Sequence, residues 1–229
     1  MTGAGAAGRT LLLDTSGPYT TAAVAEGGTL LEASSVREPP LTHLHEGVRG
    51  LMAGLGLRVA DLARIAVVTG PGSWTGLNIG VTAAKTLAQV LGVPLVPLSS
   101  LDALVADLEW TEGPVVALLD AKRGNVYRAA YEAGEDGRPR LPGPETEVVP
   151  VPERGAAIRA APGAPLAVEY GAAFRERLEA LGGPARLLAR DHLSPEGLLR
   201  SYLQATATAP PLTGDDALTL SPRYLQRMV

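Results

Sequence analysis

The pattern of apolar and polar positions divides the chain into two successive sets of elements. Three short runs rich in apolar and β-branched residues open the first set, and helical periodicity then alternates with short apolar runs. The pattern predicts strands at residues 10–16, 20–26, 29–36, 65–69 and 95–98, and helices at residues 43–55, 75–91 and 99–108. The predicted order is therefore βββαβαβα.

The same order begins again at residue 115. It predicts strands at residues 115–120, 125–132, 145–149, 166–170 and 186–189, and helices at residues 153–160, 172–181 and 195–205. Each half opens with a strand that ends in aspartate, Asp14 or Asp120, and continues through a glycine-containing turn into a strand of small residues. Such a repeat predicts an α/β fold of two tandem ribonuclease-H-like domains, the architecture of actin, Hsp70 and sugar kinases (ASKHA).

The repeat also predicts the domain bounds. We expect a disordered tail at residues 1–9, an N-terminal domain with partner-binding helices at 10–110, and a smaller C-terminal domain at 111–229.

Composition and charge exclude several classes of protein. The net charge of −4 and the scattered arginines argue against a protein that binds nucleic acid alone. The chain has no cysteine, which excludes disulfides and thiolate nucleophiles, and no apolar run long enough to predict a membrane span. These features favour a cytoplasmic protein.

Two short polar segments are candidates for binding a nucleotide or another anion. Asp14, Thr15 and Ser16 follow the first strand, where an aspartate can position a magnesium-bound water and small neighbours let backbone N–H groups approach phosphate. Gly72 and Ser73 lie in a glycine-rich turn before a helix N-terminus, which can also hold an anion. No lysine follows these glycines, so the motif is not a Walker A loop. An ordinary turn and a capped helix are the structural alternative.

A metal site is not expected. His43 and His45 are two residues apart, so on one helix their side chains point about 200° apart. The remaining histidine, His192, lies far along the chain.

The two longest helices of the first half carry more apolar and small surface than one sheet requires. In residues 75–91 this surface covers an arc of about 200°, where about 100° suffices for packing on a sheet. In residues 43–55 three glycines form a second stripe, although each glycine costs about 1 kcal/mol inside a helix. We predict an interface with another protein; packing of the two helices on each other is the alternative. The predicted interface residues are Leu44, Gly47, Val48, Gly50, Leu51, Gly54, Gly76, Ile79, Gly80, Ala83, Ala84 and Leu87.

Four motifs stand out. The most specific is GPGSWTGLNIG at residues 70–80, and the others are LDTS at 13–16, DAKR at 120–123 with Val126 and Tyr127, and a C-terminal set of Pro222, Tyr224, Leu225 and Arg227. Together they resemble the TsaB (YeaZ-like) family, the dimerisation subunits of the bacterial tRNA threonylcarbamoyladenosine (t6A) complex. That family commonly has Phe where Trp74 stands, and residues 134–200 match it weakly.

The resemblance implies a non-catalytic, scaffolding role. TsaD, the catalytic paralogue, binds metal through an H-x-x-x-H helix and transfers threonylcarbamoyl to N6 of adenosine 37 in tRNAs that read A-starting codons. Here Gly47 follows His43 at the fourth position, so that ligand pair is missing. The resemblance further implies binding to a TsaD-like partner through residues 41–55 and 75–91, a TsaE-like ATPase in the full complex, and a homodimer when the partner is absent.

Cofactor and nucleic-acid expectations follow from the same resemblance. No cofactor is expected on the chain alone, and ATP or ADP is expected at most at the interface with the partner. Contact with tRNA is expected only through the complex. Two rival functions stay open: an autonomous ATPase or phosphotransferase that uses Asp14 and residues 70–76, and a peptidase, for which the chain offers no cysteine and no paired metal ligands.

Overall fold

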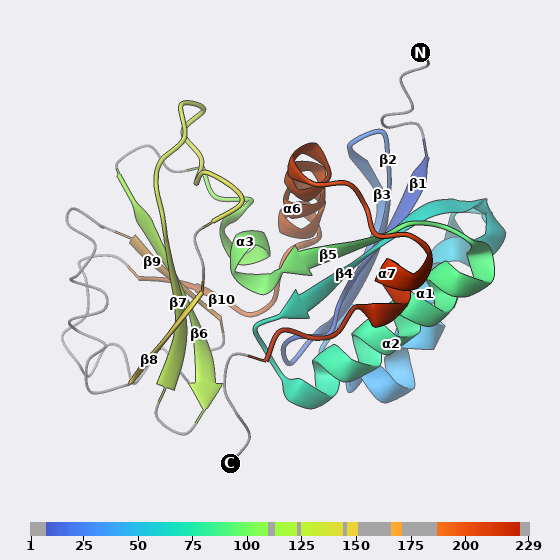
Figure 1. Ribbon diagram of the computed structural model, residues 1–229, viewed down its shortest axis with the longest axis horizontal. Helices are drawn as coiled ribbons and strands as arrows, with labels where there is room; N and C mark the ends of the chain where they lie inside the picture. Colours follow the sequence, from blue (N-terminus) through green and yellow to red (C-terminus); the bar gives the residue numbers. More distant parts are fainter. Residues whose placement is uncertain are drawn as a thin grey trace.

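The computed structural model describes residues 8–109, 113–122, 125–143, 146–150, 166–170 and 187–224. These residues build two five-stranded sheets that lie next to each other along the long axis of the molecule (Figure 1). The first sheet consists of β1 (Arg9–Asp14), β2 (Thr20–Glu26), β3 (Thr29–Val36), β4 (Leu62–Gly70) and β5 (Leu95–Ser99). The second consists of β6 (Val115–Lys122), β7 (Asn125–Tyr131), β8 (Glu147–Pro150), β9 (Leu166–Tyr170) and β10 (Leu187–Arg190).

Strand order confirms the duplicated unit. The first sheet has the order β3-β2-β1-β4-β5 and the second β10-β9-β6-β7-β8, which repeats the first when read from its other edge. In each sheet the first three strands in sequence pair antiparallel, and the last two join in parallel. The α/β fold of paired ribonuclease-H-like units, predicted from the sequence, is therefore confirmed.

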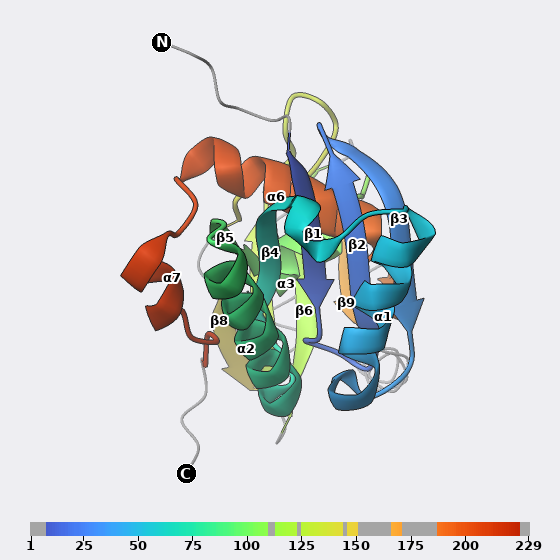
Figure 2. The ribbon, with the colours of Figure 1, turned by 90° about the vertical axis from the view of Figure 1, so that its right-hand side faces the viewer.

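Helices cover both faces of the first sheet. On one face α1 (Pro40–Gly54) and α2 (Trp74–Leu91) lie side by side (Figure 2), and a short 3-10 helix, η1 (Val59–Asp61), leads into β4. On the other face lie α3 (Ser100–Val105) and α6 (Pro195–Thr208). Successive side chains of β1 point to opposite faces of the sheet, so both faces carry apolar residues. Leu11 and Leu13 join the core under α1 and α2, while Leu12 joins the core under α6.

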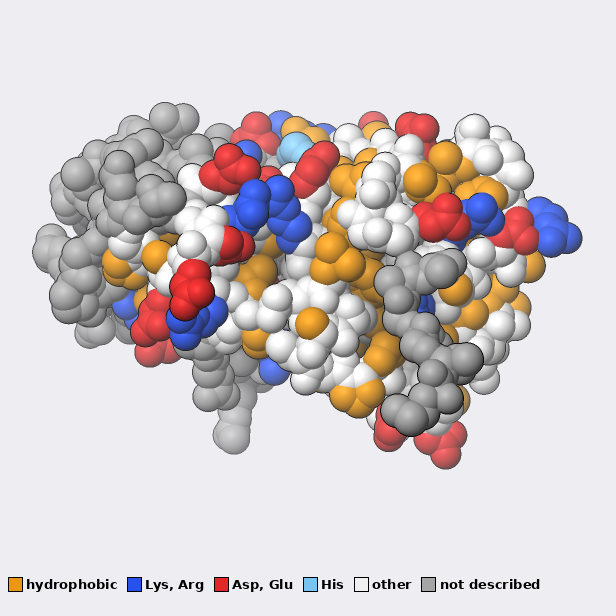
Figure 3. All heavy atoms as spheres, turned by 90° about the horizontal axis from the view of Figure 1, so that it is seen from above, with side chains coloured by type: hydrophobic (Ala, Val, Ile, Leu, Met, Phe, Trp, Pro, Cys, Tyr) orange, Lys and Arg blue, Asp and Glu red, His pale blue; other side chains and the backbone are white. Residues whose placement is uncertain are grey.

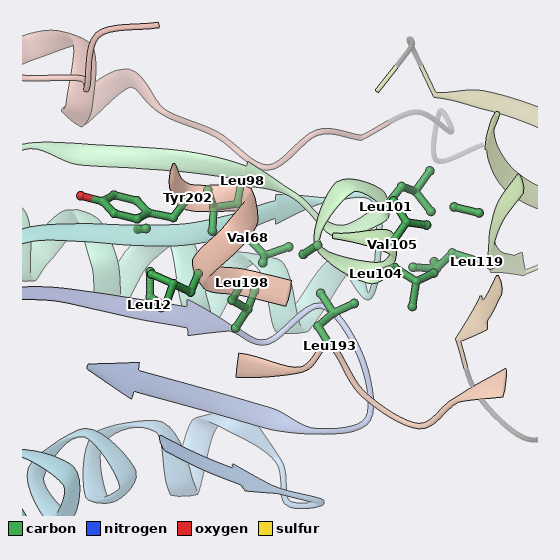
Figure 4. Close-up of a cluster of buried hydrophobic side chains, with 14 of the residues drawn as sticks. Leu12, Val68, Leu98, Leu101, Leu104, Val105, Leu119, Leu193, Leu198 and Tyr202 are labelled. Atoms are coloured by element: carbon green, nitrogen blue, oxygen red, sulfur yellow. The ribbon is translucent and has the colours of Figure 1, made fainter. Parts of the chain in front are cut away.

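The core under α6 continues into the second sheet. Figure 4 shows Leu198 and Tyr202 of α6 near Leu12 of β1, and Leu104 of α3 beside Leu119 of β6. All five side chains are buried in one cluster. The two sheets therefore share a hydrophobic core.

The C-terminal segment corrects the predicted domain division at residue 111. α6 packs on the first sheet and on α3, and α7 (Gly214–Thr219) packs on α2. Between them, Leu212 pairs with Leu95 at the edge of β5. The cause is the apolar stripe of α6, which includes Leu198 and Tyr202 and covers the face of the first sheet that α1 and α2 leave open. Residues 195–224 thus complete the first half.

Most observed helix ends lie within a few residues of the predicted ones. Ser73 and Ser99 cap α2 and α3, and serine is among the residues preferred at this position. α1 begins earlier than predicted, at Pro40, because proline suits the first helical turn. The helices expected at 153–160 and 172–181 lie outside the described residues, and α7 was not predicted. No helix in the described part of the chain is long and apolar enough to cross a membrane.

Candidate functional site around the glycine-rich loop

The turn after β1 is completely enclosed. Asp14, Thr15 and Ser16 are all buried, and the Asp14 Oδ1 atom accepts a hydrogen bond from the Ser16 backbone N–H at 2.8 Å. The other oxygen, Oδ2, has no hydrogen-bond partner among the described residues. Burial raises the pKa of Asp14 from 3.8 to about 6. A carboxylate in this setting has no access to the solvent from which a magnesium-bound water would come.

The glycine-rich loop, residues 70–73, packs its backbone directly on that turn. The Ser73 N–H donates to the Ser16 carbonyl at 2.7 Å. A Cβ atom at Gly72 would lie 2.6 Å from the same Ser16 oxygen, so only glycine allows this approach. On the far side of the loop, Ser100 Oγ donates to the Pro71 carbonyl at 2.5 Å. The loop is therefore clamped between β1 and α3.

The small residues of α2 serve the same contact. The Thr15 hydroxyl donates to the Gly76 carbonyl at 2.7 Å. Cβ atoms at Gly76 and Gly80 would overlap the Thr15 carbonyl oxygen and the Thr15 hydroxyl oxygen, respectively. Ala84 continues the stripe and is fully buried. The prediction that Gly76, Gly80 and Ala84 contact a partner protein is wrong, because Thr15 of the same chain fills the space beside the two glycines and Ala84 is buried.

The glycines of α1, unlike those of α2, have open space around them. A Cβ atom added at Gly47, Gly50 or Gly54 would meet nothing within 4 Å. Leu44, Val48 and Leu51 point into the core and are buried there, so they are not available to a partner. Ile79, Ala83 and Leu87 of α2 are only partly buried. We call the accessible set the outer helix face: Gly47, Gly50, Gly54, Ile79, Ala83 and Leu87.

These contacts argue against a phosphate site in this chain. Two donors that could hold an anion are already engaged, since the Ser73 N–H bonds Ser16 and the Gly76 N–H bonds the Ser73 hydroxyl. The volume that the glycines free is filled by Thr15 and Ser16. The described residues contain no group of three His, Asp or Glu side chains that could hold a metal ion. Contacts within the chain therefore occupy the space and the donors that a phosphate would need at this loop.

A C-terminal strap, residues 220–224, fastens the loop and α2 from outside. The Arg223 N–H donates to the Thr69 carbonyl at 2.7 Å, and the Tyr224 hydroxyl donates to Asn78 Oδ1 at 2.8 Å. The Tyr224 ring lies 6.1 Å from the ring of Trp74, and both side chains are exposed. Periodicity gives no signal for this strap, although Pro222 and Tyr224 belong to the family motif.

Known proteins resemble this chain in sequence and in fold. A family model described as "TsaD: tRNA N6-adenosine threonylcarbamoyltransferase" matches residues 41–146. The "tRNA threonylcarbamoyladenosine biosynthesis protein TsaB" of Bacillus subtilis is 40% identical over 110 residues, which cover 48% of this chain and 45% of that protein. An uncharacterised protein of Mycobacterium bovis is 30% identical over 221 residues, covering 95% of this chain and 91% of its own.

A solved structure carries the comparison across both halves. YeaZ from Pseudomonas aeruginosa matches with a TM-score of 0.77 at 27% identity, over 95% of this chain and 100% of that chain. The chain belongs to the TsaB (YeaZ-like) family. It spans about half the length of the relatives that carry the TsaB name. Within this TsaB-family chain, the glycine-rich loop, α2 and all of α1 except Pro40 fall inside the segment that matches the transferase model.

Proposed function

We propose that this chain is a non-catalytic subunit in t6A formation, which binds a TsaD-like transferase and so supports threonylcarbamoyl transfer to N6 of adenosine 37 in tRNA. The relatives named TsaB support a role in t6A formation, because their names describe t6A biosynthesis. The enclosed Asp14 turn supports a role without catalysis, because its polar groups do not reach solvent. A TsaE-like ATPase would join the assembled complex, and ATP or ADP would bind only where both subunits meet.

The open glycine stripe of α1 is the observation that supports the binding face. Each glycine costs about 1 kcal/mol relative to alanine inside a helix. Gly76 and Gly80 recover that cost through contact with Thr15, whereas Gly47, Gly50 and Gly54 face open space in the free chain. A partner backbone that approaches α1 closely would explain them. Leu41 and Val90, which are 79% and 77% exposed, add apolar area at the ends of the two helices.

Titration calorimetry with the purified TsaD-like partner tests this assignment. Gly50→Arg places a long charged side chain on the outer helix face and should abolish binding while leaving the chain folded. His45→Arg is the matched control, because His45 is exposed on the same helix about 140° away from Gly50. It should bind the partner as the parent chain does.

Gly50→Ala gives a finer readout. Alanine fits the free chain, so the variant should gain up to about 1 kcal/mol of stability. If the partner backbone approaches Gly50, the same variant should bind more weakly, so stability and affinity change in opposite directions. Unchanged affinity for both Gly50 variants would remove the outer helix face from the interface. Sedimentation of Gly50→Arg without the partner tests the proposed homodimer, which should dissociate to monomers.

A further inference from the structure

A cavity of about 330 Å³ lies between α6 and the end of the first sheet where β1 begins. Its floor is a single row of residues in register across three strands: Ala25 of β2, Thr10 of β1 and Arg64 of β4. Leu199, Tyr202 and Leu203 of α6 form the opposite wall. Figure 3 views this end of the molecule from above and shows hydrophobic side chains gathered over α6.

Arg64 stands where the strand pattern calls for an apolar residue. Along β4, Ala66 and Val68 point into the core under α6, and Arg64 is the preceding residue on that face. Its side chain is partly buried and has no hydrogen bond or ion pair with any described residue. Its nitrogen atoms are not among the buried polar atoms that lack a partner, so the charged end of the side chain reaches solvent. An arginine on the core-facing side of an interior strand, with no counter-ion among the described residues, is the feature that needs explanation.

The other groups of the cavity complement an anion. No acidic side chain is among the described residues that line it, although the chain as a whole carries a net charge of −4. The Tyr202 hydroxyl accepts from Thr10 Oγ1 at 3.1 Å, and no described residue accepts its own hydrogen, which can therefore be donated to a ligand. Ala25 in the floor and Leu199 and Leu203 in the opposite wall present apolar side chains.

We propose that this cavity binds a small organic anion in which one acidic group is joined to an apolar body. Arg64 and the Tyr202 hydroxyl hold the acidic group, and the leucines of α6 pack on the body. The volume lies at the lower end of the range for ligand pockets, which suits a molecule of fatty-acid or aromatic-acid size. The cavity lies across the first sheet from α1 and α2, so a partner on the outer helix face leaves it accessible.

Octanoate and 1-octanol are the probes that test it, because they share the body and differ in charge. Calorimetry on the full chain should show octanoate binding about tenfold or more tightly than octanol. Arg64→Met keeps a long apolar side chain and should abolish that preference. Arg49→Met, at an exposed arginine of α1, is the matched control and should bind octanoate normally.

Leu203→Glu provides a second variant that does not touch Arg64. Leu203 is 40% exposed, so the new carboxylate can stay hydrated while it repels octanoate from the cavity. Octanoate affinity should fall in this variant and octanol affinity should fall less. Equal binding of the two probes, no detectable octanoate binding, or an unchanged preference in Arg64→Met would each overturn the proposal. None of these results bears on partner binding.

Discussion

The two halves of the chain build the same strand and turn but enclose them differently. β1 ends in Asp14, and β6 carries Asp120 near its end. Each Oδ1 atom accepts the backbone N–H two residues later at 2.8 Å. Asp14 is fully buried beneath the glycine-rich loop, whereas Asp120 is partly exposed and pairs with Lys122 at 3.0 Å. The comparison teaches that this turn is a local structural unit, and that its surroundings decide whether the carboxylate reaches solvent.

The residues that make the difference are small ones outside the turn. In the first half, Gly72 and Gly76 bring the loop and α2 onto the backbone of Thr15 and Ser16. In the second half, Lys122 stands two residues after the aspartate and adopts a positive φ of 63°. A turn that serves packing in one half is thus a solvent-exposed corner in the other.

The largest expected effect comes from breaking the close approach in the first half. Gly76→Ala should lower the free energy of unfolding by about 2–4 kcal/mol, because the new Cβ overlaps the Thr15 carbonyl and backbone cannot move cheaply. Gly50→Ala makes the identical change in open space and should not destabilise the chain. Urea unfolding of the pair measures the contrast. Equal effects would show that α2 stands away from the turn in solution.

The next effect concerns the buried carboxylate. Because the pKa of Asp14 is about 6 when folded and 3.8 otherwise, the folded state binds the proton more tightly. The contribution of Asp14 to the free energy of unfolding is therefore most favourable below about pH 4, and it declines as the pH rises to about 6. Asp14→Asn keeps the acceptor for the Ser16 N–H and removes the charge. The free energy of unfolding of this variant should exceed that of the parent chain by about 1–3 kcal/mol near pH 8 and should differ little near pH 4.

Asp120→Asn is the comparison for that experiment. Its ion pair joins a mostly exposed Lys122 to a partly exposed Asp120, so the change should stay within about 0.5 kcal/mol near pH 8. Urea unfolding measured across pH for both variants separates the two turns. A flat pH profile for the Asp14 variant relative to the parent would mean that solvent reaches the first turn.

The smallest expected effect is at the second turn itself. Lys122→Gly relieves the left-handed backbone, and the exposed ion pair it removes contributes little. We expect a gain below about 1 kcal/mol in the thermal or urea midpoint. A loss larger than that would show that the Lys122 side chain, and not the backbone, holds the corner.

Much of the fold follows from local signals in the sequence. β2 and β3 have the bounds predicted from alternation and the glycine turn, and α2 ends at Leu91, as predicted. The return of α6 and α7 to the first sheet could not be predicted, because an apolar stripe shows that a helix packs but not on which sheet. Likewise a small-residue stripe signals close approach without naming the neighbour. That is why Gly80 and Gly50 look alike in sequence and differ in the structure.

The path of the chain makes the second half an insertion within the first. Residues 195–224 carry α6, the Leu212 bridge to Leu95, and the Arg223 bond to Thr69, all of them contacts with the earlier sheet. During translation, α3 alone therefore covers part of one face of the first sheet until about a hundred further residues have left the ribosome. Shortening the gene at its 3′ end would damage the half that is synthesised first.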